Sequence, residues 1–300
     1  MKTGIEITGI EIFLVAVVAI GLSWCGLVFA PQVQLGGARL ETVLNSADTH
    51  PLQPTGAASL GLQVYRANGC AACHTEQVRQ TGVACEITLT SLGVHTPEDF
   101  TAFVHSLFAS LPTLAPYTNA MSAGLQGWKG ELPKSFLTAT DKTVADDMAN
   151  RLKAVGVKFE QRIIATGPDI IARRWGVRQS VAADYLYDQP VQLGSLRAGP
   201  DLSNVGARTD ANWQLRHLYA PKSVVADSTM PSFKFLFEVR PAGSVSSPDA
   251  LKLSAEFAPA AGYEVVPTAE AKDLAAYLLS LKIGVPLYEA PFTPVISAKP

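Results

Sequence analysis

The sequence is poor in charge and in cysteine. Charged residues make up 17% of its 300 positions and the formal net charge is −2, so the chain lacks the basic face of a nucleic-acid binder. Four cysteines are too few for a disulfide scaffold, and their spacing therefore matters more than their number. Repeats and low-complexity tracts are absent as well. Apolar residues are plentiful at 48%, which is typical of a globular or membrane-attached chain and excludes a disordered one.

One long uncharged run stands near the amino terminus, from Ile12 to Ala30, between Glu11 and Pro31. A helix over this run would be roughly 28 Å long, close to the ~30 Å hydrocarbon core of a membrane. We therefore expect residues 1–30 to form a transmembrane anchor. A cleaved signal peptide is the alternative, because the run ends in small residues. The length of the run and the proline directly after it favour the uncleaved anchor.

The rest of the chain divides by composition. Residues 31–56 hold three prolines and predict a tether between the membrane and a domain. Residues 57–79 predict a short helix that runs into a cysteine motif. The last helix is expected from about Ala269 to Leu281, and residues 284–300, with four prolines, are expected to form an extended tail.

Residues 81–170 behave as a separate unit. Thr96-Pro97-Glu98-Asp99 predicts a helix start with an N-cap, a first-turn proline and early acidic residues. A second amphipathic stretch runs from about Thr143 to Val155. Between them lies a loop, residues 112–140. The pattern predicts a small helical subdomain.

The chemistry is carried by Cys70-Ala71-Ala72-Cys73-His74, the attachment signature of a c-type haem. On one helical turn both thiols reach the same side, and the histidine that follows points at the iron. In a chain with four cysteines and five histidines, chance produces this pattern roughly once in a thousand sequences. A redox dithiol needs no histidine, and a zinc site needs two further ligands at close spacing. We therefore expect one covalent haem c with His74 as an axial ligand.

Met230 is the expected second axial ligand, because it lies in a proline-held loop late in the domain, Ser228-Thr229-Met230-Pro231. Met148 falls on the apolar face of an expected helix, where packing is the default role, and Met121 lies in a polar loop. A thioether raises the potential of the iron and closes it to other ligands, which favours electron transfer. The carbonyl of Pro200 is the expected partner of the other His74 nitrogen, with Pro168 in a duplicate Gly-Pro-Asp sequence as the rival.

The sequence resembles the mono-haem membrane-anchored subunit, subunit II, of cbb3-type cytochrome c oxidases. The resemblance is carried by Gly69 to Arg79 and by a longer series that starts at Arg174-Trp175-Gly176, passes Gly199-Pro200-Asp201-Leu202 and Trp213, and ends at Met230-Pro231. It implies a mainly α fold, with one transmembrane helix and a class I cytochrome c domain over residues 57–283. By position it makes Cys70 and Cys73 the thioether links, makes His74 and Met230 the axial ligands, places Arg197 near the haem propionates, and gives Trp213 and His217 a supporting or contact role.

The sequence departs from the family at Gln80, where the family has proline, and at the unit 81–170, which is extra. A surface insertion whose ends lie close together costs little closure entropy. The resemblance implies an electron-transfer subunit with no catalytic residue of its own, because oxygen reduction would take place on another subunit. Its expected partners are the catalytic haem–copper subunit and a further cytochrome c subunit.

Haem c attachment takes place outside the energy-conserving membrane. We therefore expect a single-pass protein of the bacterial inner membrane with residues 31–300 in the periplasm. Two other functions are compatible with the haem motif. One is a free-standing membrane-anchored cytochrome that shuttles electrons between complexes, and the other is an assembly subunit whose haem is structural.

Overall fold

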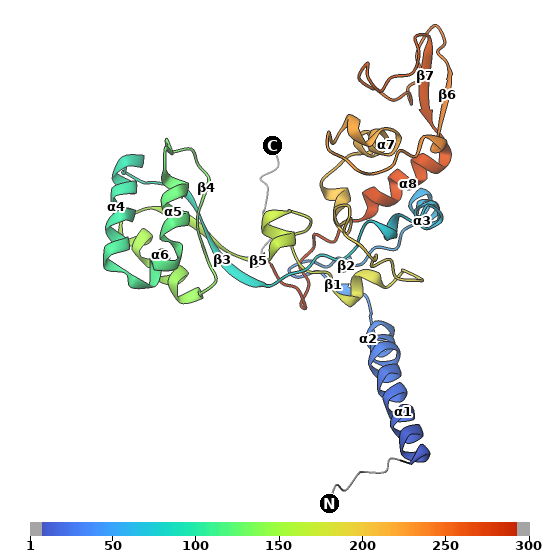
Figure 1. The fold of residues 1–300 in the computed structure, drawn as a ribbon. Coiled ribbons are helices and arrows are strands. Elements are labelled where there is room, and N and C mark those ends of the chain that lie inside the picture. Colours follow the sequence, from blue (N-terminus) through green and yellow to red (C-terminus); the bar gives the residue numbers. More distant parts are fainter. Residues whose placement is uncertain (1–7, 293–300) are drawn as a thin grey trace, which may run out of the picture.

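A computed structural model describes residues 8–292, apart from the side chains of residues 34–36. Figure 1 shows three parts along the chain: a projecting amino-terminal helix, a helical domain, and a separate α/β unit on the far side of a pair of long strands. We use "helical domain" for residues 57–79 together with 168–283, and "insertion unit" for residues 82–166.

The amino-terminal helix is longer than the sequence predicts. It comprises α1 (Gly9–Trp24), a π-helical turn (Cys25–Phe29) and α2 (Ala30–Gly36). The stretch Gly9–Val33 is long and apolar enough to cross a membrane, and α1 has no buried residue. The helix extends beyond the expected end of the anchor at Ala30 and continues through Pro31 to Gly36; residues 1–7 of that expectation lie outside the described residues. The wider turn, in which the Ala30 amide donates to the Cys25 carbonyl, accommodates a ring that has no N–H to offer.

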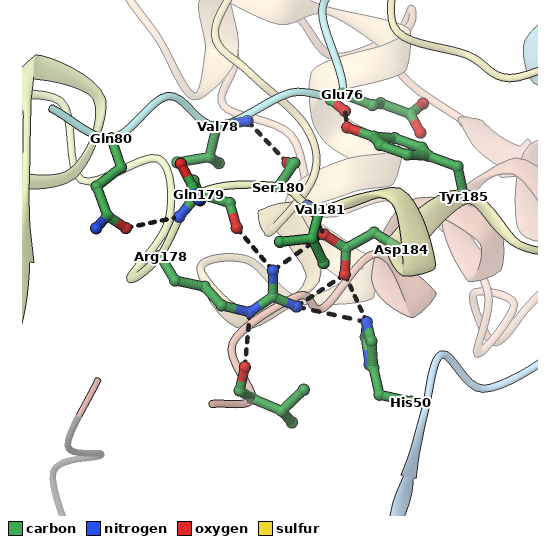
Figure 2. Close-up of polar contacts among 11 residues, drawn as sticks. His50, Glu76, Val78, Gln80, Arg178, Gln179, Ser180, Val181, Asp184 and Tyr185 are labelled. Carbon is green, nitrogen blue, oxygen red and sulfur yellow. Dashed lines mark hydrogen bonds and ion pairs between the residues drawn. The ribbon is translucent and has the colours of Figure 1, made fainter. Parts of the chain in front are cut away.

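The segment expected to be a tether is instead docked on the helical domain. Strand β1 (Glu41–Thr42) pairs antiparallel with β2 (Thr49–His50). His50 is 8% exposed, and its Nε2 lies 2.6 Å from Asp184 Oδ1. The fully buried Arg178 donates to both oxygens of Asp184, at 2.7 and 3.0 Å, as Figure 2 shows. These buried contacts fix the hairpin where composition alone predicted a tether.

The helical domain is built on two crossed helices, α3 (Ala57–Ala67) and α8 (Ala269–Ser280). A Cβ at Gly61 would lie 1.9 Å from the Asp273 carbonyl oxygen, so only glycine permits this approach. Above Gly61 the rings of Tyr65 and Tyr277 are 5.2 Å apart. Helix α7 (Ala211–Tyr219) and the buried residues Val205, Leu218, Leu236, Val265 and Leu274 complete this core.

The remaining helical elements of this domain are short. They are η2 (Cys70–Ala72), the π turn η4 (Pro168–Ala172), η5 (Ala182–Tyr185), η6 (Val205–Ala207), η7 (Pro221–Ser223) and η8 (Lys234–Leu236). A hairpin of β6 (Phe237–Pro241) and β7 (Tyr263–Pro267), which the mainly α prediction did not include, projects from the domain.

The insertion unit is an α/β structure: the helices of the predicted small helical subdomain are present, but they pack on a sheet that the sequence did not predict. Three strands, β3 (Gly82–Ser91), β4 (Lys134–Ala139) and β5 (Lys158–Thr166), form a sheet in the order β4-β3-β5 with antiparallel pairing. The helices are α4 (Pro97–Ser110), the 3-10 helix η3 (Pro112–Tyr117), α5 (Thr118–Leu125) and α6 (Lys142–Ala154). The expected start of α4 is confirmed, since the Thr96 side chain accepts from the Asp99 amide. A separate core lies between sheet and helices, including Ile87, Leu89, Phe100, Met148 and Leu152.

The two ends of the insertion unit lie side by side at the edge of the helical domain. The Thr81 amide donates to the Thr166 carbonyl at 2.8 Å, and Gly82 pairs with Thr166 at the base of the sheet. The unit therefore leaves and re-enters the helical domain through two adjacent chain segments, which is the geometry that a low closure cost requires.

The carboxyl-terminal segment packs against the docked hairpin as far as the structure describes it. Leu287 and Ala290 are buried with Val43 and Val181, and the Leu44 amide donates to the Pro286 carbonyl. The described part, residues 284–292, is therefore not a free tail. Residues 293–300 of that prediction lie outside the described residues.

Candidate haem site

The cysteine motif forms a tight turn directly after α3. Cys70–Ala72 is a single 3-10 turn, and the His74 amide donates to the Cys70 carbonyl at 3.0 Å. Cys70 is half-buried and Cys73 exposed, and neither forms a disulfide. Burial raises the pKa of the Cys70 thiol to about 11. The motif therefore places two free thiols and an imidazole within one turn of the chain.

The imidazole of His74 is held from the loop that contains Pro200. Its Nδ1 lies 2.8 Å from the Pro200 carbonyl oxygen, the partner expected from the sequence. Because a carbonyl only accepts, Nδ1 carries the hydrogen and Nε2 keeps a lone pair for a metal. A Cβ on Gly199 would lie 2.2 Å from His74 Cε1, so the ring rests against a backbone that must be glycine. The rival Pro168 carbonyl instead accepts from the Arg173 amide inside η4.

Asp201, which follows Pro200, fixes this loop to the chain after the motif. Its carboxylate is fully buried and accepts from Thr75 Oγ1 at 2.6 Å and from the Gln77 amide at 2.7 Å. The Ser203 amide adds a third hydrogen bond at 3.0 Å. A carboxylate that accepts from three donors is held in one orientation. The position of the Pro200 carbonyl is thereby set by the residue beside it.

Arg197 lies in the same loop and is already engaged by the protein. Its Nη1 donates to both oxygens of Asp169, at 2.9 and 2.7 Å, and its Nη2 donates to the Gln77 carbonyl. The Nε atom is buried and has no hydrogen-bond partner among the described residues. The structure brings Arg197 to the haem motif, and the propionate contact that the resemblance implies stays a prediction.

Met230 is half-buried in the loop between η7 and η8. It packs against the same core as Cys70 and Leu218, its amide donates to Ser228 Oγ at 3.3 Å, and it lines a cavity of about 550 Å³. Met121 and Met148 are both buried in the core of the insertion unit, where they pack rather than face the motif. Met230 is therefore the one methionine of the described residues in the helical domain.

The histidines differ in their surroundings. His217 stacks on Trp213 with ring centroids 4.7 Å apart. Burial lowers the pKa of His217, and its Nδ1 has no partner among the described residues. His95 Nε2 lies 2.8 Å from the Val155 carbonyl oxygen in the insertion unit, and His105 lies edge-on to Phe108. His50 is buried against Asp184, away from the motif.

Glu76 was missed by the sequence reasoning, although it follows the motif at two residues' distance. It is 4% exposed and accepts hydrogen bonds from the Tyr277 hydroxyl, at 3.2 Å to Oε1 and 3.1 Å to Oε2. Burial, together with the nearby charge of Asp188, raises the pKa of Glu76 to about 8. A buried acid beside a cysteine motif has no signature in a single sequence, since its burial depends on α3 and α8.

These residues fit a haem. The two thiols and the imidazole share one turn, the His74 ring is oriented with Nε2 free, and Gly199 leaves room against it. The unpartnered polar atoms of Arg197 and His217 also belong to segments that surround the motif. The arrangement can bind a flat, anionic, metal-containing ring.

Comparison with known proteins points the same way. Residues 169–257 match the family model described as cytochrome C oxidase, mono-heme subunit/FixO. The resemblance to that family is thereby confirmed over this part of the chain, which holds Pro200, Arg197 and Met230, and it supports a haem and a role in electron transport. No curated protein matches the chain significantly.

Proposed function

We propose that this chain is the electron-transfer subunit of a cbb3-type terminal oxidase, with one covalent haem c bound through Cys70 and Cys73 and held between His74 and Met230. The observation that carries this proposal is the hydrogen bond from His74 Nδ1 to the Pro200 carbonyl. It joins the cysteine motif to the segment that matches the oxidase-subunit family. A dithiol needs no imidazole, and a structural zinc site needs four ligands, whereas the described residues contain no group of three or more His, Cys, Asp or Glu side chains placed to hold a metal ion.

His74 and Met230 would hold the haem iron, and a haem bound in this way would supply a one-electron couple that is closed to other ligands. The chain's own residues supply the positions. Cys70 and Cys73 present their sulfurs on one turn, Pro200 fixes the His74 tautomer, and Asp201 fixes Pro200. Met230 comes from a loop whose proline neighbours and core packing limit its freedom. Such preorganisation suits a site that changes charge without changing shape.

The partners follow from the family. A subunit of a cytochrome oxidase implies a catalytic subunit, and we propose a further cytochrome c subunit as the electron donor. The near-neutral charge of the chain offers no strong field for capturing a soluble cytochrome, which favours a donor held in the same complex. We place the protein in a bacterial inner membrane, crossing once, with the helical domain in the periplasm as a class I cytochrome c domain.

Replacing Met230 by alanine tests the ligand assignment. The variant should keep its covalent haem, show a lower midpoint potential, and bind carbon monoxide when reduced, because the thioether no longer closes the iron. Met121→Ala is the matched control, since it removes a buried methionine from the insertion unit and should leave both properties unchanged. An unaltered potential and no carbon monoxide binding in Met230→Ala would show that another group is the ligand.

A further inference from the structure

The sequence contains Gly-Pro-Asp twice, and the site described above uses only the second copy. Asp169, in the first copy, lies where the chain re-enters the helical domain from the insertion unit. Its carboxylate is 1% exposed. It accepts from the Arg79 amide at 3.0 Å, from Arg173 Nη1 at 2.8 Å, and from Arg197 Nη1 at 2.9 and 2.7 Å.

Asp201 and Asp169 both accept hydrogen bonds from one extended segment, the residues that directly follow His74. Asp201 accepts from Thr75 and Gln77, and Asp169 accepts from Arg79. Three alternate residues of this segment are thus held by two buried carboxylates from different parts of the chain. The first Gly-Pro-Asp copy therefore serves the same structural segment as the second.

Arg197 connects Asp169 and this segment to the cysteine motif. Its loop is fastened on both sides of it, by the Ser195 amide to the Ala71 carbonyl at 3.0 Å and by the Gly199 amide to the Cys73 carbonyl at 2.9 Å. The guanidinium lies over the Trp175 ring at 5.3 Å from the centroid. The orientation of the arginine is thus set by Asp169, Gln77 and Trp175 together.

The charges of Arg173, Arg197 and Asp169 do not cancel. The guanidiniums of Arg197 and Arg173 both lie over Trp175 and share the one carboxylate of Asp169, which leaves a net charge of about +1. Burial opposes ionisation of Asp169, but hydrogen bonds from Arg197, the Arg79 amide and Arg173 outweigh it and lower the pKa of this carboxyl. Arg197 Nε is a buried donor without a partner among the described residues. A cationic cluster with a spare donor calls for an anion, and a carboxylate is the group that a guanidinium fork fits best.

We propose that Asp169 is a positioning residue of the cofactor site, which holds the Arg197 guanidinium so that its Nε serves a carboxylate at the edge of the haem. This inference rests on the proposed function, because it assumes a haem on Cys70 and Cys73. It gives the junction of the insertion unit a role in the electrostatics of the site, exerted through Arg197.

The test is a double-mutant cycle on the haem midpoint potential, measured by redox titration of the purified full chain. Arg197→Gln should lower the potential, because it removes the positive charge that offsets a haem carboxylate. Asp169→Asn should also lower it, since the amide presents N–H groups to the guanidiniums and releases Arg197. In the Arg197→Gln background, Asp169→Asn should lower the potential no further.

The proposal is contradicted if the potential shifts of the two single variants add in the double variant, or if Asp169→Asn leaves the potential unchanged. It is also contradicted if Asp169→Asn raises the potential equally in the wild-type and Arg197→Gln backgrounds, because that result would reflect only the through-space effect of the lost charge. Glu86→Gln is the matched control, because it breaks another carboxylate–arginine pair, with Arg162, in the insertion unit and should not move the potential. If Asp169→Asn fails to accumulate, Arg197→Lys replaces it: this variant keeps the charge but loses the fork, so its potential should still fall, and an unchanged value contradicts the proposal. A wild-type chain without covalent haem would refute the proposed function itself.

Discussion

Single buried carboxylates do much of the positioning in this molecule. Asp201 and Asp169 each satisfy three or more donors, and Asp184 joins His50 to Arg178 in the same manner. In each case the donors come from segments far apart in the sequence. Because a buried carboxylate is stable only when its donors are in place, these residues define the loops around the haem motif more strictly than apolar packing would.

Glu76 differs from these aspartates, since its surroundings favour the protonated form. Its folded-state pKa, raised to about 8, lies above the unfolded-state value. Between about pH 4.5 and pH 8 the folded chain therefore holds a proton that the unfolded chain has released, and stability falls as pH rises through this window. Glu76→Gln removes this dependence and should be more stable than wild type at pH 8, by on the order of a few kcal/mol, and similar to it at pH 4.5.

Denaturant unfolding of both proteins across this pH range measures the difference. Parallel stability curves for the wild type and Glu76→Gln would contradict the assignment of a protonated buried acid. A stability gap that opens only above pH 5 would support it.

The sequence predicted the residues of the cysteine motif better than the buried residues that surround and position them. Spacing alone selected Cys70, Cys73 and His74 as candidates. Pro200 was proposed because a metal-bound histidine needs a carbonyl partner and because the sequence after it resembles a cytochrome, and the structure places its carbonyl 2.8 Å from His74 Nδ1. Asp169 and Glu76 could not be selected in this way, because their roles depend on burial by segments that lie more than 100 residues away or behind an insertion. The duplicated Gly-Pro-Asp is visible in the sequence, but the role of its first copy depends on the ion pair between Asp169 and Arg197, which the sequence does not reveal.

Among the elements, the insertion unit shows what periodicity can and cannot reveal. Its helices α4 and α6 were predicted from their 3.6-residue patterns and caps. Strand β3 was not predicted, although Cys85, Ile87 and Leu89 alternate with polar residues and all three face the core. Local alternation does not reveal this strand, because it depends on pairing with β4 and β5, which lie far along the chain.

The position of the ends leads to a prediction about deletion. Replacing residues 82–166 by a short glycine-rich turn should leave haem attachment and the haem spectrum unchanged, because the two residues to be joined, Thr81 and Gly167, already lie side by side and closure is inexpensive. Deleting residues 81–170 should instead alter the midpoint potential, because this larger cut also removes Asp169. Difference spectra and redox titration of the two deletions separate these outcomes, and identical potentials would contradict the role given to the junction.

At the scale of the whole molecule, the amino-terminal helix and the helical domain are joined more firmly than a tether would allow. The hairpin that follows the helix is buried against Arg178 and Asp184, and the described end of the chain covers it. α2 also packs against η5, the short helix that carries Asp184. A domain held in this way has a defined orientation relative to the candidate membrane span, which supports the proposed relay to a neighbouring subunit.

The central claim is that this chain carries a covalent haem c within an oxidase. The most direct measurement is a reduced-minus-oxidised spectrum, with oxygen consumption, of material purified in mild detergent through a tag on this chain. The account predicts a c-type signal together with b-type haem from a catalytic subunit, in a sample that consumes oxygen. A c-type signal alone, in several mild detergents, would contradict the oxidase assignment and favour a free-standing membrane cytochrome.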